Sequence, residues 1–156
     1  AGGLPMSASA PRAVTACTLR RPQGAAGGPS IVEIVCGPSG LEVYERAGEG
    51  AVDALEDRLR RRFGDDLEGM RAACLALGGR EVEQGDLGMV LNTFPRLPLL
   101  FIAWKGDEEF PPSLRILFDA SATSYLNAFE LRMLCGEIAN RLIGIADGRL
   151  QPPPGA

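Results

Sequence analysis

Three consecutive carboxylates, Asp107, Glu108 and Glu109, are the residues whose types and spacing most directly suggest chemistry. They follow an apolar run that ends in the only tryptophan and the only lysine of the chain, Trp104 and Lys105. Carboxylate oxygens bind hard cations such as Mg²⁺ and Ca²⁺, and they also act as general acids or bases. Three interpretations are therefore open: a metal site, an acid–base centre, or a turn that is either simply solvated or faces a partner.

The spacing of the carboxylates argues against a metal cage. The Ca²⁺-loop pattern D-x-[DN]-x-[DN]-G is absent, and adjacent residues of an extended turn point apart, so the three cannot all share one ion. Asp119 ends the next apolar run. If the two runs pair as antiparallel strands, Asp119 lies near 97–99 and away from Asp107. We expect no metal here and interpret the turn as a binding edge made of Trp104, Lys105, Asp107, Glu108, Glu109 and Phe110.

The predicted binding edge has a rigid shape. Pro111 and Pro112 fix their φ angles, which stiffens the turn without a metal ion. Lys105 is expected to form a local ion pair with Asp107 or its neighbours, worth only ~0–1 kcal/mol at an exposed site. A stiff acidic turn beside aromatic residues suits a protein partner with a basic surface, or a small ligand.

The catalytic repertoire of the chain is narrow because it contains no histidine. Ser-His-Asp and Cys-His catalysis are excluded within the chain, as are His-ligated zinc and iron sites. Acid–base work would fall to carboxylates, Lys105, a cysteine, Tyr44 or Tyr125. No residue is assigned a catalytic role, and the cofactor is left unknown.

The four cysteines and the charge exclude further classes. No C-x-x-C pair is present, so neither a zinc ribbon nor an iron–sulfur cluster motif is predicted. Cys74 and Cys135 fall on apolar helix faces and are expected to be buried, without disulfide or catalytic roles. The net charge of −4 argues against nucleic acid as a partner. The absence of a signal peptide or an 18-residue apolar run predicts a cytoplasmic protein without membrane contact.

Strands and helices must position these residues. Two β-rich runs, 31–36 and 41–45, flank Gly-Pro-Ser-Gly and predict a hairpin. Further strands are predicted over 88–91, 99–103 and 114–119, the second of them central and covered on both faces. Apolar residues at three- and four-residue steps predict helices over 48–64, 65–79 and 127–144.

Particular residues mark the helix ends and the domain limits. Asp65 or Asp66 is expected to cap the second helix, Asn127 and Glu130 stand at capping-box spacing, and Gly144 is expected to end the last helix. The fold class is α+β, with a small mixed sheet built from hairpins and packed against two or three amphipathic helices. We expect a flexible N-terminal arm over 1–29, one domain over 30–144 and a disordered tail over 145–156.

The order of these motifs resembles a known family. The stretch FPRLPLLFIAWKGDEEFPPSLRILFDASATSYL, followed by an amphipathic helix, is similar to the uncharacterised family called domain of unknown function 3786. The resemblance runs from about Phe63 to Leu142, and the hairpin over 31–45 looks like the family's N-terminal part. Between 45 and 63 this chain is shorter than the family pattern, which predicts that a segment is missing there.

The resemblance implies a setting more than a reaction. Family members occur in anaerobic bacteria and archaea, near corrinoid and iron–sulfur proteins. We therefore expect a non-catalytic accessory or binding module in anaerobic corrinoid or iron–sulfur redox metabolism. The alternative is a small carboxylate-dependent enzyme, with or without a metal ion, that uses residues 107–109 and Tyr125. A homo-oligomeric structural protein is the third hypothesis.

Overall fold

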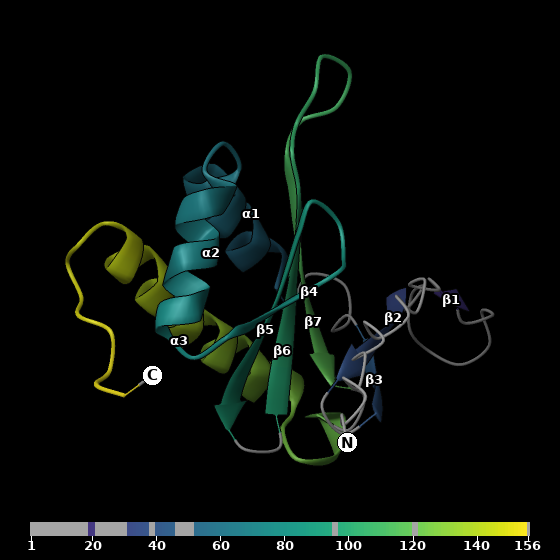
Figure 1. Cartoon of the computed structure of the whole chain (residues 1–156). Coiled ribbons are helices and arrows are strands. Elements are labelled where there is room, and N and C mark those ends of the chain that lie inside the picture. Colours follow the sequence, from purple (N-terminus) through teal and green to yellow (C-terminus); the bar gives the residue numbers. More distant parts are fainter. Residues whose placement is uncertain are drawn as a thin grey trace, which may run out of the picture.

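A computed structural model describes residues 19–20, 31–37, 40–45, 52–94, 97–119 and 122–155. One antiparallel sheet and three helices make up this part of the chain, and the helices lie together on one side of the sheet (Figure 1). The helices are α1 (Asp53–Phe63), α2 (Leu67–Ala76) and α3 (Ala128–Ala146), with a short 3-10 helix η1 (Ala122–Ser124) before α3. The predicted α+β class is confirmed.

The sheet has seven strands in the order β1-β2-β3-β7-β6-β5-β4. Their bounds are β1 (Leu19–Arg20), β2 (Ile31–Gly37), β3 (Gly40–Glu45), β4 (Arg80–Val82), β5 (Leu87–Phe94), β6 (Leu97–Trp104) and β7 (Ser113–Asp119). Every pair of neighbouring strands is antiparallel, whereas a mixed sheet was expected. The physical reason is that β4 to β7 follow one another through short connections, which permit only antiparallel neighbours.

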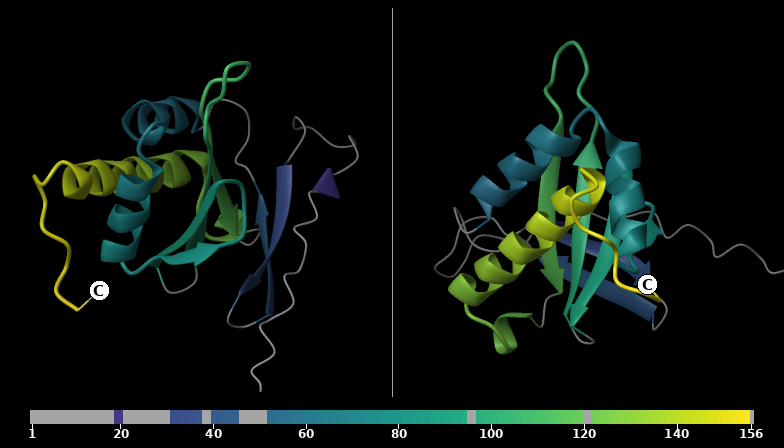
Figure 2. Two further views of the ribbon diagram at one scale, coloured as in Figure 1. Left: turned by 45° about the horizontal axis from the view of Figure 1, so that its top comes forward. Right: turned by 90° about the vertical axis from the view of Figure 1, so that its left-hand side faces the viewer.

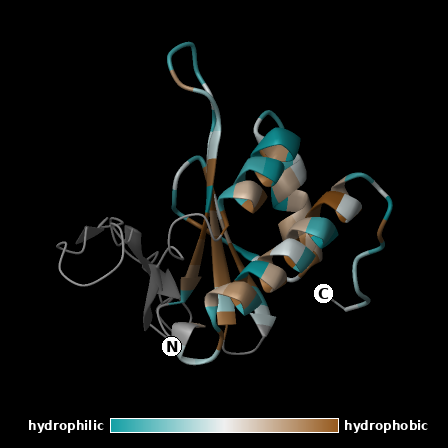
Figure 3. Cartoon of the chain, turned by 180° about the vertical axis from the view of Figure 1, so that it is seen from behind, coloured by the Kyte–Doolittle hydropathy of each residue, from teal (hydrophilic) through white to brown (hydrophobic). Residues whose placement is uncertain are grey.

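The two faces of the sheet separate by strict alternation along the strands. On β6, Leu99, Phe101 and Ala103 join the core beneath the helices, whereas Leu100 and Ile102 belong to a second cluster on the opposite face. The strands stand out as apolar ribbons beside the amphipathic helices (Figure 3). The prediction of a central strand covered on both faces is confirmed, because these five side chains are all buried.

The N-terminal hairpin, β2 and β3, is the part of the sheet that lies away from the helices (Figure 2, left). The predicted hairpin is confirmed, and its strands extend one residue further into Gly-Pro-Ser-Gly than expected, since Gly37 pairs with Gly40. The hairpin joins β7 through only two residue pairs, Tyr44 with Asp119 and Glu45 with Phe118. The short strand β1 falls within the predicted N-terminal arm, and the rest of that arm, 1–18 and 21–29, lies outside the described residues.

Both predicted helix N-caps form. The Asp66 side chain accepts from the backbone N–H of Gly69 at 2.9 Å. At the start of α3, Asn127 Oδ1 accepts from the Glu130 N–H at 3.0 Å, and Glu130 Oε2 accepts from the Asn127 N–H at 2.8 Å. These bonds satisfy N–H groups that lack a partner in the first turn of a helix, which fixes where the helices begin.

The predicted stop at Gly144 is wrong, because α3 continues to Ala146. The chain reverses instead at Gly148, which has a φ of 70°. The N–H groups of Arg149 and Leu150 then donate to the Gly144 carbonyl at 2.8 and 3.0 Å. A Cβ at Gly144 would lie 2.7 Å from Leu150 Cγ. The glycine is therefore used for close approach of the returning chain, and the first residues of the expected tail pack back onto the helix.

Candidate functional site

The connection between β6 and β7, residues 105–112, extends well beyond the helices and the other loops (Figure 1). The last ladder pair below it joins Trp104 to Ser113. We call residues 105–112 the acidic projection, because they include the three consecutive carboxylates. The predicted binding edge thus lies at the most protruding loop of the described domain.

Asp107 organises the tip of the acidic projection. Its Oδ1 atom accepts from the backbone N–H groups of Glu109 and Phe110, at 2.8 and 2.7 Å. Its own N–H donates to the Phe110 carbonyl at 2.8 Å. Aspartate is common at such turns because its side-chain oxygen can accept from backbone N–H groups two and three residues later. Asp107 Oδ1 is used in this way. Glu108, Glu109 and Phe110 are left exposed at the tip, Phe110 with 67% of its surface accessible.

The base of the acidic projection is packed against the first helix. A Cβ at Gly64, which follows α1, would lie 3.1 Å from the Pro112 Cβ. A Cβ at Gly106 would lie 2.8 Å from the Pro112 nitrogen. Both glycines therefore give Pro112 room to sit between α1 and the returning strand. Together with the fixed φ of proline, this contact holds the direction in which the loop leaves the sheet.

The predicted binding residues do not form one patch. Trp104 is half-buried and packs with the second-face cluster, and the guanidinium of Arg115 lies 5.8 Å from its ring centroid. Phe110 is at the tip, separated from Trp104 by the length of the loop. The expected local ion pair of Lys105 is wrong, because its ammonium group has no carboxylate partner among the described residues. Lys105 instead donates its backbone N–H to Asp86 Oδ2 at 2.7 Å.

Asp119 lies at the opposite end of β7 from the acidic projection. Phe118 pairs with Leu99 in the ladder, and Asp119 pairs with Tyr44 on the other side. The sequence argument that Asp119 and Asp107 do not share a site is therefore confirmed.

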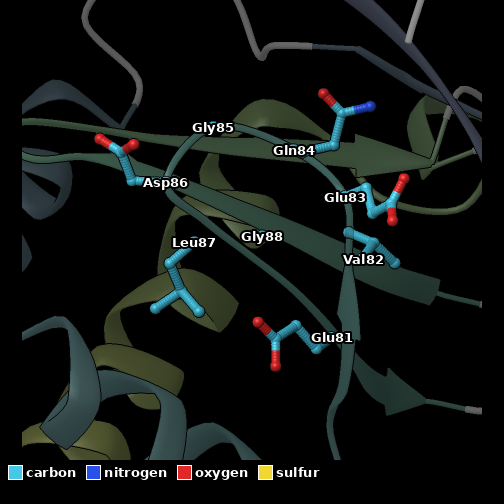
Figure 4. Close-up of a pocket in the computed structure, with 8 residues that line it drawn as sticks. All are labelled: Glu81, Val82, Glu83, Gln84, Gly85, Asp86, Leu87 and Gly88. Carbon is cyan, nitrogen blue, oxygen red and sulfur yellow. The ribbon is translucent and has the colours of Figure 1, made fainter. Parts of the chain in front are cut away.

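A pocket at the β4–β5 connection was not predicted from the sequence. Figure 4 shows its lining, which is the loop itself and the strand residues that flank it: Glu81, Val82, Glu83, Gln84, Gly85, Asp86, Leu87 and Gly88. Two of its carboxylates are engaged, because Glu81 pairs with Arg71 at 3.1 Å and Asp86 binds the Lys105 N–H. The sequence feature at this position is the pair Gly85 and Asp86, residue types that are common in turns. The hydrogen bond from the Lys105 N–H to Asp86 connects the β4–β5 loop to the base of the acidic projection.

The carboxylates of the described residues are spread over several elements. No group of three or more His, Cys, Asp or Glu side chains within 52–94, 97–119 and 122–155 is arranged to hold a metal ion. Among the described helices, none is both long enough and apolar enough to cross a membrane.

A buried carboxylate that the sequence did not single out, Glu56, accepts from the Ile116 N–H at 2.9 Å beneath α1.

Cys74 and Cys135 are buried and not disulfide-bonded. Burial raises the pKa of each thiol to about 12, and the nearby Glu56 carboxylate adds to the rise for Cys135. Because a raised pKa favours the neutral thiol at all lower pH values, we expect both to react slowly with thiol reagents at pH 8. Stopped-flow labelling with and without denaturant, followed by peptide mass mapping, measures this. Equal rates in both conditions at either cysteine would contradict the assignment.

The fold and its loops define an all-antiparallel α+β domain that carries a projecting acidic hairpin. The chain belongs to the family described as Domain of unknown function (DUF3786), whose model matches residues 42–141. The match covers β4 to β7, the whole acidic projection and α3 as far as Arg141. No curated protein and no solved structure is similar enough to the chain to match it.

Proposed function

We propose that the protein is a non-catalytic binding module whose acidic projection recognises a basic surface on a protein partner. The observation that supports this most is the use of Asp107. Its Oδ1 atom accepts two backbone hydrogen bonds that hold the turn. The result is a preformed tip on which Glu108, Glu109 and Phe110 are exposed to solvent. A loop that is shaped before binding loses less conformational entropy on complex formation.

The chemistry of the tip suits a protein partner. An exposed phenylalanine next to two glutamates offers an apolar anchor with charges that steer a basic surface toward it. The β4–β5 loop adds Glu83 near the same end of the sheet, through the Asp86 bond to Lys105. A small ligand is the alternative kind of partner for this tip, and we do not expect nucleic acid, because the net charge is −4.

The setting is a proposal that comes from the family resemblance alone. We propose that the protein is cytoplasmic and serves as an accessory module in anaerobic corrinoid or iron–sulfur redox metabolism. The enzyme alternative would need free carboxylates at residues 107–109 and a nearby Tyr125. Asp107 is bound to the backbone, and Tyr125 follows the far end of β7, so no observation favours this alternative over the binding module.

Replacing Glu108 and Glu109 by glutamine is expected to weaken partner capture at least ~10-fold with an unchanged melting temperature, because both side chains are exposed and Asp107 is kept. The measurement is quantitative capture from a lysate of the native host, read by mass spectrometry. The matched control, Asp57→Asn with Glu68→Gln, removes the same two charges from α1 and α2. Equal capture by the wild type and the tip variant would contradict the proposal.

A metal titration separates the binding module from a metal site. Calorimetry of the wild type with Mg²⁺, Mn²⁺ and Ca²⁺ is expected to show no binding tighter than ~10 µM, since two exposed glutamates supply too few oxygen ligands for tight binding of these ions. Tighter binding that disappears in the Glu108→Gln, Glu109→Gln variant would identify the projection as a metal site and overturn the proposal.

A further inference from the structure

A stripe of side chains along the outer face of α3 is left largely open by the other described elements. Phe129, Met133, Gly136 and Asn140 follow one another at steps of four, three and four residues, which places them on one side of a helix. Phe129 and Met133 are 65% and 58% exposed. The same steps form the seam of a two-stranded coiled coil, so the stripe has the pattern of a helix–helix contact.

A groove between α1 and α3 runs along this stripe. Its lining comes from both helices: Leu55, Arg132, Met133, Gly136, Glu137 and Asn140. The two helices lie side by side (Figure 2, right), and Arg58 of α1 donates to Asn140 Oδ1 at 2.6 Å. A Cβ at Gly136 would meet only Leu55 Cδ2, at 4.0 Å. Gly136 therefore leaves a notch with an apolar floor in the middle of the stripe.

The charges on the two sides of the stripe have opposite signs. At about 100° per residue, Arg132 lies on the side of the stripe that faces α1, where Arg58 is also exposed. Glu130 and Glu137 lie on the other side. Glu137 is paired with Arg141 at 2.9 Å, but both are more than half exposed, so this pair is weak and can exchange.

We propose that the groove is occupied by α3 of a second copy of this chain, with the two helices parallel. In a parallel pair the basic side of one helix faces the acidic side of the other, so Arg132 of each copy meets Glu137 of its partner. This is the pairing between flanking positions that selects partners in parallel coiled coils. An antiparallel pair would set Arg132 against Arg132 and Glu130 against Glu137. The charge pattern therefore favours α3 of a second copy as the occupant of the groove, and it favours the parallel over the antiparallel arrangement.

The dimer is expected to be weak, because the apolar part of the contact is limited to Phe129, Met133 and Leu55. Sedimentation equilibrium of the full chain between ~10 µM and ~1 mM should show a reversible monomer–dimer equilibrium, with a Kd on the order of 100 µM. Met133→Lys should raise that Kd at least ~10-fold without unfolding, because Met133 is exposed in the monomer. The matched control is Leu75→Lys, which changes an exposed apolar residue of α2.

A charge swap tests the direction of the helices. Arg132→Glu should weaken the dimer, and adding Glu137→Arg to it should restore the wild-type Kd, because the exchanged pair is again complementary across a parallel contact. A chain that stays monomeric at ~1 mM, or a dimer that Met133→Lys leaves intact, overturns the proposal. A dimer that is weakened by Arg132→Glu and not restored by the double replacement overturns the parallel arrangement.

Discussion

Replacing Leu100 with aspartate is expected to unfold the domain. Leu100 is 0% exposed on the central strand β6, where it contacts the second-face cluster that includes Ile102 and Leu117. An unpaired carboxylate buried there costs several kcal/mol. That cost is comparable to the ~5–15 kcal/mol by which a whole domain is stable. Circular dichroism during thermal unfolding measures the effect, and loss of the cooperative transition is the expected result.

The control for this prediction is the same substitution at a solvent-facing position. Leu75→Asp on α2 should keep the transition within a few degrees of the wild type, because nearly half of the Leu75 surface is already exposed. If the Leu100→Asp variant were soluble and unfolded cooperatively at the wild-type temperature, the second face of the sheet could not be buried as described.

Replacing Glu56 with alanine is expected to destabilise the domain by about 1–3 kcal/mol, the usual cost of leaving a buried hydrogen-bonding group without its partner. Glu56 is only 8% exposed, and it receives the Ile116 N–H of β7 at 2.9 Å. Among the described residues, the neighbouring strand β3 pairs with β7 only at Phe118 and Asp119, so no described strand accepts from the Ile116 N–H on that side. The side chain therefore takes the place of a missing strand partner.

Chemical denaturation of three forms tests this role. Glu56→Gln keeps a side-chain oxygen that can accept from Ile116, so its midpoint should lie between those of the wild type and Glu56→Ala. An alanine variant as stable as the wild type would show that the Ile116 N–H finds another acceptor, and it would remove the reason for a carboxylate beneath α1.

The sequence predicted the elements whose signals are local. The two N-caps and the Gly-Pro-Ser-Gly hairpin all form, because each depends on residues only a few positions apart. Strand β4 was missed, since its three residues have no apolar alternation of their own and depend on pairing with Met89 and its neighbours. The end of α3 was misjudged because Gly144 serves a contact with Leu150 that sequence spacing does not reveal.

The candidate site was predicted in position but not in its internal roles. An acidic turn between two apolar runs was visible in the sequence, and the structure places it at a protruding hairpin. The role of Asp107 as the acceptor for two backbone N–H groups, and the partial burial of Trp104, depend on three-dimensional contacts. Glu56 was not singled out either, because its partner Ile116 is sixty positions away in the chain.

Site-specific photo-cross-linking from position 110 tests the proposed recognition most directly. A photoreactive phenylalanine analogue replaces Phe110 in the full chain, and the matched probe replaces the exposed Leu75 on α2. Irradiation in cells of the native host should link position 110, and not position 75, to a defined protein with a basic surface. The same link should be lost when Glu108 and Glu109 are changed to glutamine. Identical cross-linking from both positions, or no cross-link from position 110, would contradict the assignment of the acidic projection as a recognition element.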